Sequence, residues 1–216
     1  MNVANVFITG GTGYIGSRLI PELLARGHTV RALVREGSVA KLPKGATPIV
    51  GNPLDRATFA GQVAPSDTFV QLVGVPHPSP AKAQQFRDVD LVSVTASAAA
   101  ARDAGVVHFI YLSVAQPAPV MRDYVAVRAE GERLIRETGM AATFVRPWYV
   151  LGPGHRWPYL LLPLYWLWGL NPKSRDTARR LYPVTLRSVI RAIADAVGNV
   201  PYGTRVIEAP ELRSRA

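Results

Sequence analysis

The sequence predicts an α/β fold: a doubly wound parallel sheet with helices on both faces and a small C-terminal appendage. Two observations predict it. Short apolar runs alternate with helix-like segments along most of the chain, and this order produces parallel strands joined by helices. The first apolar run also passes directly into the glycine-rich turn 10–16, which opens the first helix-like segment.

The first elements follow from the apolar pattern and its stop signals. Asn5–Thr9 is a buried-strand pattern, and the amphipathic segment Ile15–Arg26 after the turn predicts a helix. Gly27 is a helix stop, so His28–Val34 is the second expected strand. These elements form a strand–turn–helix–strand unit at the start of the chain.

The next elements are shorter. Thr47–Val50 fits a third strand, and a short helix is expected near Arg56–Gln62. Thr68–Val73 is an apolar strand that ends at Gly74. The proline-rich residues 75–80 supply few backbone donors, so they are expected to form a loop.

The central elements repeat the alternation. Lys82–Ala104 is an Ala-rich helix pattern, and Val107–Val114 is a strand pattern. Tyr124–Thr138 predicts a helix with several charged pairs, and Ala142–Val145 begins a sixth strand. Together these segments complete the expected sheet.

The end of the chain predicts a small second region. Residues 1–154 are expected to form the main domain, and 155–216 a C-terminal region that returns to the sheet within one compact unit. Within it, Leu186–Gly198 fits a helix and Thr204–Glu208 a strand.

The glycine turn has the arrangement that seats a dinucleotide pyrophosphate on a helix N-terminus. Gly10 allows the sharp turn out of the strand, Gly13 admits close backbone approach to phosphates, and Gly16 lets the helix lie close to the sheet. An ordinary glycine-rich loop is the alternative interpretation. The flanking strand and helix patterns favour a dinucleotide site in a Rossmann-type fold.

The end of the second strand indicates which dinucleotide is held. An NAD site usually carries Asp or Glu about 20 residues past the glycine turn. This chain has Arg35 there, which can form paired hydrogen bonds to a 2′-phosphate, with Glu36 next to it. NADP is therefore expected over NAD.

The composition excludes several classes of protein. Hydrophobic residues make up 48% of the 216 residues, which is ample for a core. The absence of cysteine excludes disulfides, thiolate metal sites and cysteine nucleophiles. No His pair has metal-ligand spacing, so no metal is expected. The N-terminus lacks a basic leader region, which predicts a cytoplasmic protein without a signal peptide.

The net charge of +10 is concentrated in the second half of the chain. Within residues 146–191, Asp176 is the single acid among many basic side chains. Such a patch suits anionic lipid, nucleic acid or a phosphorylated ligand, although the plainer interpretation is a solvated basic face. No specific nucleic-acid partner is expected.

The segment Trp157–Trp168 is densely apolar and aromatic, and two prolines interrupt it. It is too short and too broken for a spanning helix, which needs about 20 residues. Core packing, the wall of an apolar substrate pocket and a peripheral membrane contact through residues 157–180 all remain open. The basic residues just beyond it suit the membrane interpretation.

Several motifs in order resemble the short-chain dehydrogenase/reductase superfamily. The chain is most similar to its atypical or extended branch, which includes NmrA-like proteins and nucleoside-sugar epimerase relatives. The resemblance spans about residues 3–154. The motifs that carry it are Gly10-x-x-Gly13-x-x-Gly16, Gly51-Asn-Pro-Leu-Asp55, Leu72-Val-Gly74, Tyr111-Leu-Ser113, Tyr124-x-x-x-Arg128 and Arg146-Pro147 followed by Gly152.

The resemblance implies a set of cofactor contacts. Asn52 stands where the family generally has an Asp beside the adenine, and an amide can also bond the adenine edge. The end of the fourth strand would run along the adenine ribose, and Pro147 would lie near the nicotinamide. The cofactor-binding residues expected on this basis are Gly10, Thr12, Gly13, Tyr14, Ile15, Gly16, Arg35, Asn52, Leu54, Leu72, Gly74 and Pro147.

The resemblance also implies a catalytic trio. Family members use a Ser, a Tyr as general acid/base, and a Lys four residues after that Tyr. Ser113 and Tyr124 match, but Arg128 stands at the Lys position. A guanidinium supplies charge and donors, yet it cannot relay a proton and needs more room. Substrate contacts are expected from His77, Trp148, His155 and Trp157.

Three functions follow from this reasoning. The leading one is an NADP(H)-dependent oxidoreductase that acts on a small, largely apolar carbonyl or alcohol. The second is a redox-inert NADP(H)-binding sensor or scaffold, at a membrane or on a protein partner, which the Arg at the Lys position favours. The third is an epimerase or isomerase, although the short C-terminal region leaves little room for nucleotide-sugar substrates.

Overall fold

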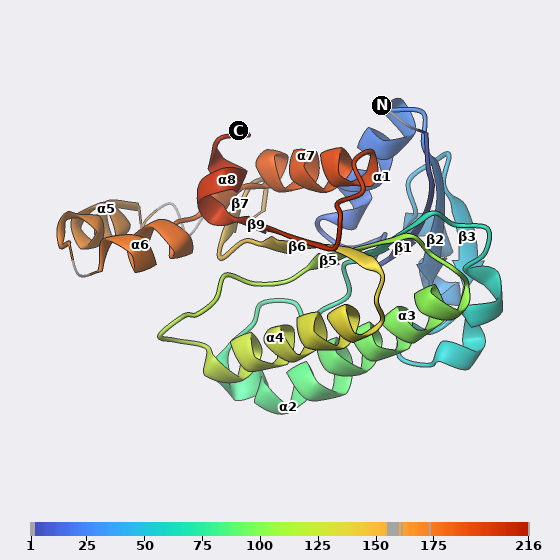
Figure 1. The fold of residues 1–216 in the computed structure, drawn as a ribbon, viewed down its shortest axis with the longest axis horizontal. Helices are drawn as coiled ribbons and strands as arrows, with labels where there is room; N and C mark the ends of the chain where they lie inside the picture. The colour runs from blue at the N-terminus through green and yellow to red at the C-terminus, as the bar shows by residue number, and fades with distance from the viewer. Residues whose placement is uncertain (1–2, 155–159, 161, 173, 216) are drawn as a thin grey trace.

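The computed structural model describes residues 3–154, 160, 162–172 and 174–215. In this part of the chain, seven parallel strands form a sheet in the order β3-β2-β1-β4-β5-β6-β9 (Figure 1). The strands are β1 (Asn5–Thr9), β2 (Thr29–Val34), β3 (Thr47–Val50), β4 (Thr68–Gln71), β5 (His108–Leu112), β6 (Ala141–Arg146) and β9 (Thr204–Glu208). Two short strands, β7 (Val150–Leu151) and β8 (Val184–Thr185), pair separately.

Helices cover both faces of the sheet, with α1 and α7 on one face and α3 and α4 on the other (Figure 1). The helices are α1 (Gly16–Ala25), α2 (Ala83–Gln85), α3 (Val92–Asp103), α4 (Arg122–Glu137), α5 (Leu162–Leu170), α6 (Arg175–Leu181), α7 (Leu186–Val197) and α8 (Ala209–Arg213). Shorter turns are the 3-10 segments η1 (Glu36–Lys41), η2 (Arg56–Thr58), η3 (Ala60–Gln62) and η4 (Pro80–Lys82), and the π-helical η5 (Phe86–Leu91). The predicted doubly wound α/β fold is confirmed.

Strand alternation divides the core into two layers. Val6 and Ile8 pack in the layer that contains α1 and α7, whereas Phe7 packs in the layer that contains α3 and α4. This follows from the period of two along a strand. Phe7 and Phe69 are register partners on β1 and β4, and their ring centroids lie 5.2 Å apart. Phe109 continues the row on β5, 5.1 Å from Phe69.

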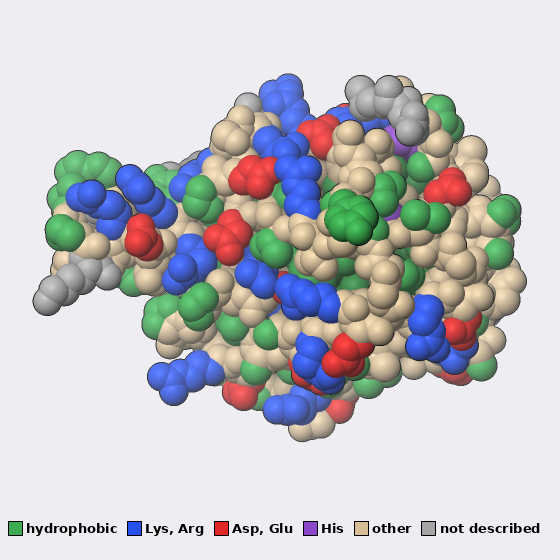
Figure 2. Space-filling view, viewed as in Figure 1, with side chains coloured by type: hydrophobic (Ala, Val, Ile, Leu, Met, Phe, Trp, Pro, Cys, Tyr) green, Lys and Arg blue, Asp and Glu red, His purple; other side chains and the backbone are tan. Residues whose placement is uncertain are grey.

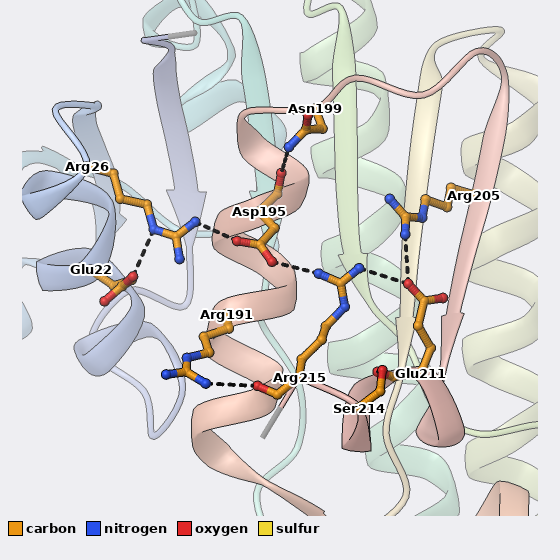
Figure 3. Close-up of polar contacts among 9 residues, drawn as sticks. All are labelled: Glu22, Arg26, Arg191, Asp195, Asn199, Arg205, Glu211, Ser214 and Arg215. Carbon is orange, nitrogen blue, oxygen red and sulfur yellow. Dashed lines mark hydrogen bonds and ion pairs between the residues drawn. The ribbon is translucent and has the colours of Figure 1, made fainter. Parts of the chain in front are cut away.

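A chain of ion pairs fastens the end of the polypeptide to the first helix (Figure 3). Arg26 Nη1 at the end of α1 lies 2.7 Å from Asp195 Oδ1 on α7. Arg215 Nη1 lies 2.6 Å from the other oxygen of Asp195, and its Nη2 lies 2.9 Å from Glu211 Oε1. Arg205 on β9 also pairs with Glu211, at 2.7 Å. The C-terminal strand and helix are therefore joined to the same face as α1.

Helices α5 and α6 project from the body of the molecule and lie at the far left of Figure 1. We call residues 162–172 and 174–181 the α5–α6 arm. The buried Tyr165 holds the base of the arm, where it packs with Trp148, Ala115 and Leu181. None of the described helices is long and apolar enough to span a bilayer.

Some sequence-based boundaries were wrong. The expected helix Lys82–Ala104 is not continuous: η4, α2 and the π-helical η5 precede α3. Phe86 and Asp90, four residues apart in η5, are both buried. The expected helix Arg56–Gln62 is two separate 3-10 turns. The sequence reasoning also missed β7, β8, η1, α5, α6 and α8.

Candidate dinucleotide and catalytic site

The glycine turn is shaped by close backbone contacts. Gly10 has a φ of +76°, and a Cβ there would lie 3.0 Å from the carbonyl carbon of Leu72. A Cβ on Gly16 would overlap the carbonyl oxygen of Gly10. Gly13 differs, because it is exposed and a Cβ would meet only the Gly10 oxygen, at 3.2 Å. Two glycines are thus needed by the fold, whereas Gly13 leaves space open on the outside of the turn.

The N-terminus of α1 faces this open space. Its N-cap residue, Ile15, makes no side-chain capping hydrogen bond, and the first turn contains no acidic residue. The Ser17 and Arg18 N–H groups donate to the Gly13 and Ile15 carbonyls, so the positive end of the helix dipole, rather than a set of unpaired N–H groups, would attract an anion here. Thr12 and Tyr14 are half-buried in the same turn, and the guanidinium of Arg18 lies 4.7 Å from the Tyr14 ring centroid. These features fit a dinucleotide pyrophosphate.

Arg35 is exposed immediately after β2, at the same edge of the sheet as the glycine turn. No described carboxylate lies within ion-pair distance of it, and the adjacent Glu36 is exposed as well. An unpaired guanidinium here suits a phosphate or another anion.

The turn after β3 is braced by its own side chains. Asn52 Oδ1 accepts a hydrogen bond from the Leu54 N–H at 3.0 Å, and the Asn52 N–H donates to Thr58 Oγ1 at 2.9 Å. The amide oxygen is therefore occupied, and the exposed Asn52 side chain offers its NH₂ group as a donor. An adenine ring nitrogen is an acceptor that suits it.

A row of direct contacts leads from the glycine turn to the predicted catalytic helix. Leu72 lies against Gly10, and its N–H donates to the Thr9 carbonyl at 3.2 Å. Two residues further on, a Cβ at Gly74 would overlap Arg128 Nη2. Only glycine leaves room there for the guanidinium. Arg128 thus lies beside the end of β4.

Arg128 is buried on α4 and held by several acceptors. Its Nη2 donates to Asp90 Oδ1 at 2.5 Å, and its Nη1 donates to the Leu112 carbonyl at 2.8 Å. Its Nε has no hydrogen-bond partner among the described residues. Burial lowers the pKa of Arg128, but Tyr111, Tyr124 and Asp90 outweigh that effect and raise it overall. The guanidinium is therefore a permanent charge, and its unpartnered Nε is enclosed in the protein.

Asp90 comes from the π-helical η5 and is fully buried. Its second oxygen accepts from the Val75 N–H at 2.9 Å. The carboxylate thus ties η5 and the loop after β4 to α4. The sequence reasoning missed Asp90, because the pattern of 82–104 predicts a regular helix without a buried charge.

Tyr124 lies one turn before Arg128 on α4. The Arg128 guanidinium carbon lies 5.2 Å from the Tyr124 ring centroid, a cation–π contact. Phe86 packs on the same ring with its centroid 5.0 Å away. The side chain is half-buried, and no hydrogen bond to its hydroxyl is formed by the described residues. The structure therefore brings Tyr124 and Arg128 together and leaves the phenol available.

Ser113 follows β5 and is buried, but its hydroxyl is engaged elsewhere. Ser113 Oγ donates to Glu132 Oε1 at 2.6 Å, and no described hydrogen bond joins it to Tyr124 or Arg128. Glu132 also accepts from Gln116 Nε2 at 2.8 Å. The third member of the expected trio is thus held by a carboxylate.

Glu132 is the centre of a buried polar cluster that the sequence reasoning missed. Arg146 donates to both of its oxygens, with Nε and Nη2 at 2.8 and 2.6 Å. Arg136 adds a contact of 3.0 Å. The spacing Arg128–Glu132–Arg136 along one helix face was the available signal.

The expected substrate contacts are spread over several places. His77 is exposed in the proline-rich loop and has a left-handed φ of 50°. Trp148 is half-buried and packs with Ala115 and Tyr165 at the base of the α5–α6 arm. His155 and Trp157 lie outside the described residues. Pro147 is buried, and its carbonyl accepts from the Ala115 N–H at 3.0 Å, two residues beyond Ser113.

Comparison with known proteins decides the family. Residues 10–155 match the family described as NAD(P)H-binding. The chain belongs to that family. The match includes the glycine turn, Arg35, Ser113, Tyr124 and Arg128. The resemblance to the atypical or extended branch of the short-chain dehydrogenase/reductase superfamily is confirmed.

Relatives in this family include reductases. A 4-hydroxy-2-methyl-3-oxo-4-farnesyl-3,4-dihydroquinoline-1-oxide ketoreductase of Stigmatella aurantiaca is 29% identical over 68% of this chain and 50% of that protein. A ceramide reductase of Caulobacter vibrioides is 31% identical over 69% of this chain and 47% of that protein. The chain spans about half the length of these relatives.

Solved structures share the fold. The Bordetella bronchiseptica enzyme WbmH, in complex with NAD⁺, superimposes with a TM-score of 0.70 at 21% identity. The alignment covers 94% of this chain and 75% of that chain. This domain is therefore an NAD(P)-binding member of the family, with a sheet that reaches from β3 to β9.

Proposed function

We propose that this protein is an NADPH-dependent reductase of a largely apolar carbonyl compound. One observation carries the proposal: direct contacts run from Gly10 through Leu72 and Gly74 to the Arg128–Tyr124 pair. A dinucleotide whose pyrophosphate lies at the glycine turn would extend along this row toward Tyr124. When bound there, NADPH supplies the hydride.

Arg35 supports NADPH over NADH. Its guanidinium is exposed, lies at the cofactor edge of the sheet and has no described carboxylate partner. A 2′-phosphate would give it a bidentate, charge-assisted contact. An NADH ribose hydroxyl would be better bound by a carboxylate; position 35 carries none, and the nearest in sequence is the exposed Glu36 that follows it.

Tyr124 would act as the acid. Its Oη would donate a proton to the carbonyl oxygen as the hydride reaches the carbonyl carbon. Arg128 would stabilise the phenolate that results, because its charge lies over the ring. Arginine does not deprotonate in proteins, so Tyr124 would be reprotonated from solvent rather than through Arg128.

Arg128 would act on the site through its charge. Its Nε has no hydrogen-bond partner among the described residues, but this atom is enclosed by the protein, so a cofactor hydroxyl does not reach it in this conformation. Asp90 and the Leu112 carbonyl accept hydrogen bonds from the two Nη atoms. The positive charge beside the Tyr124 ring is therefore the contribution to the chemistry that this geometry supports.

The names of two relatives support an apolar substrate. One reduces a farnesylated quinoline oxide and the other is a ceramide reductase, and both names describe compounds with long apolar chains. In this protein Ala115, which follows Ser113 closely, packs in the aromatic cluster of Trp148 and Tyr165. An apolar substrate would find matching side chains beside the candidate catalytic residues.

A second function is favoured by the hydrogen bond from Ser113 to Glu132. A serine that donates to a buried carboxylate is not free to donate to a substrate carbonyl. The protein would then bind NADPH without turnover, as a sensor or scaffold. This alternative keeps the cofactor site and removes the chemistry.

Single-turnover oxidation of protein-bound NADPH distinguishes the two functions. The panel of substrates consists of ketones with prenyl, acyl and steroid skeletons. We expect at least one to oxidise NADPH, and Tyr124→Phe to slow this step about 100-fold or more without loss of NADPH binding. The matched control is Tyr202→Phe, because Tyr202 is fully exposed in the loop before β9. Tight NADPH binding with no oxidation, identical in Tyr124→Phe, would establish the redox-inert function instead.

A further inference from the structure

The α5–α6 arm carries an unusual concentration of exposed apolar side chains. Among the described residues, all of the highly exposed leucine and tryptophan side chains lie between residues 160 and 170: Leu160, Leu164, Trp166, Leu167 and Leu170. Leu164, Trp166 and Leu167 are 61%, 64% and 56% exposed. Apolar patches of this kind on soluble domains mark interaction sites.

Two arginines of the arm, Arg179 and Arg180, and the neighbouring Arg213 on α8 form a basic region. No described carboxylate lies within ion-pair distance of Arg179, Arg180 or Arg213. Figure 2 shows green apolar and blue basic side chains together on the projecting end of the molecule. Elsewhere many surface arginines are paired, as Arg133 is with Glu130 and Glu137.

A cavity of about 310 Å³ lies where the arm meets α8. Its walls combine aromatic side chains, Tyr165, Trp166 and Tyr182, with the two arginines Arg179 and Arg213. Arg213 Nη1 donates to the Arg179 carbonyl at 3.0 Å, and its guanidinium lies 4.9 Å from the Tyr182 ring centroid. Burial lowers the pKa of Arg213, and the neighbouring Arg179 charge lowers it further. An anion between these arginines would relieve their repulsion.

We propose that the α5–α6 arm docks the protein on an anionic membrane surface. Trp166 and the exposed leucines would enter the interface, and an anionic lipid headgroup would lie at Arg179 and Arg213. Tryptophan and leucine side chains would contact the apolar lipid chains, and the arginines beside them would contact the negatively charged headgroups. A neutral protein partner would satisfy the apolar side chains but not the unpaired arginines, so charge favours the membrane.

This docking is independent of the reductase chemistry, because Trp166 and Arg179 lie on the projecting arm and Tyr124 lies on α4 (Figure 1). The base of the arm adjoins the residues that follow Ser113, through Ala115. Docking would therefore hold the candidate catalytic edge of the sheet near the bilayer.

Co-sedimentation with vesicles tests the proposal. The protein is mixed with vesicles of phosphatidylglycerol or of phosphatidylcholine, at low and high salt. We expect binding to phosphatidylglycerol that falls as salt rises and little binding to phosphatidylcholine. Arg179→Glu should weaken it about tenfold or more, whereas Lys44→Glu, an equal charge change at an exposed site before β3, should weaken it far less.

The apolar part of the surface needs its own variant. Trp166→Ser should weaken binding about tenfold or more, whereas Tyr202→Ser changes an exposed aromatic residue outside the arm and should leave binding near wild type. Both substituted side chains are exposed, so far-UV circular dichroism should be unchanged. Three results would overturn the proposal: no sedimentation at low salt, equal binding to both lipids, or a concentration-dependent dimer that Trp166→Ser abolishes. The last result would assign the surface to a second copy.

Discussion

Arg128 Nη2 and Asp90 Oδ1 lie 2.5 Å apart in an ion pair that is almost completely buried. The pair joins α4, on which Tyr124 lies, to the π-helical η5 and the loop after β4. The planar guanidinium of Arg128 donates to Asp90, Leu112 and Tyr111 at once. The single ammonium group of a lysine lacks this planar, forked arrangement of donors. Arginine therefore serves the fold here as well as the candidate site.

The first prediction concerns the stability supplied by this pair. Asp90→Ala leaves the Arg128 charge buried without its partner, so we expect the free energy of unfolding to fall by about 3–5 kcal/mol. Urea denaturation measures it. Asp88→Ala is the control, because Asp88 is exposed two residues away and its loss should cost less than about 1 kcal/mol. Equal effects of the two substitutions would mean that the pair contributes nothing beyond a surface contact.

Glu132 should be equally important to the fold. Glu132→Gln replaces an acceptor of Ser113, Arg136 and Arg146 by a group that can accept at only one atom. We expect a loss of about 3 kcal/mol or more, seen as a lower urea midpoint. The control is Glu130→Gln on the same helix, an exposed partner of Arg133, with an expected loss below about 1 kcal/mol. A midpoint for Glu132→Gln within error of the control would contradict this assignment.

Gly13 should separate cofactor binding from folding. A methyl group there meets only the Gly10 oxygen inside the protein, so Gly13→Ala should unfold within about 1 kcal/mol of wild type. The same methyl group would lie where the phosphates approach, and we expect the NADPH dissociation constant to rise about tenfold or more. Gly61→Ala places a methyl group in open space outside the site and should change neither quantity. Normal NADPH affinity in Gly13→Ala would remove this glycine from the site.

The buried His108 predicts a pH dependence of stability. Burial lowers the pKa of His108 to about 4, from about 6.5 in the unfolded chain. Above pH 6.5, His108 is neutral in both the folded and the unfolded protein, and its contribution to the free energy of unfolding is fully present. Between pH 6.5 and pH 4, only the unfolded protein binds the proton, so the free energy of unfolding decreases as the pH is lowered. Below pH 4 both states are protonated and this contribution changes no further.

The total loss from His108 is about 3 kcal/mol over that interval. Urea titrations at several pH values measure it, and His108→Gln should reduce the slope between pH 6.5 and 4 relative to wild type. The pH profile of the variant matters here rather than its absolute stability, because the substitution also disturbs the 2.8 Å contact to Thr143 Oγ1. An unchanged slope would show that His108 titrates normally in the folded protein.

The sequence predicted much of the sheet because strand patterns are local. The bounds of Asn5–Thr9, Thr47–Val50 and Thr204–Glu208 agree with β1, β3 and β9, since each is a short segment rich in β-branched residues next to glycine or proline. The helix expected over 82–104 failed where a tertiary contact overrides local propensity. The π-helical turn carries Asp90, whose partner Arg128 lies 38 positions later in the chain, and no pattern in one sequence shows that pairing.

The candidate site was predicted unevenly for the same reason. The glycine turn and Tyr124 follow from short motifs, and the structure places Tyr124 next to Arg128 as expected. The hydrogen bond from Ser113 to Glu132 was not foreseen, because it depends on how α4 packs over the end of β5. The exposure of Trp166 could not be predicted from the sequence either, because it depends on α5 projecting from the body of the molecule (Figure 1).

The central claim is that the carboxyl edge of this sheet holds NADPH through the glycine turn and Arg35. Titration calorimetry of the protein with NADPH and with NADH tests it most directly, together with Arg35→Ala and the control Lys44→Ala. The account predicts that wild type and Lys44→Ala bind NADPH about 10–100-fold more tightly than NADH, and that Arg35→Ala loses this preference while still binding NADH. No binding of either dinucleotide, or a preference that survives Arg35→Ala, would contradict it.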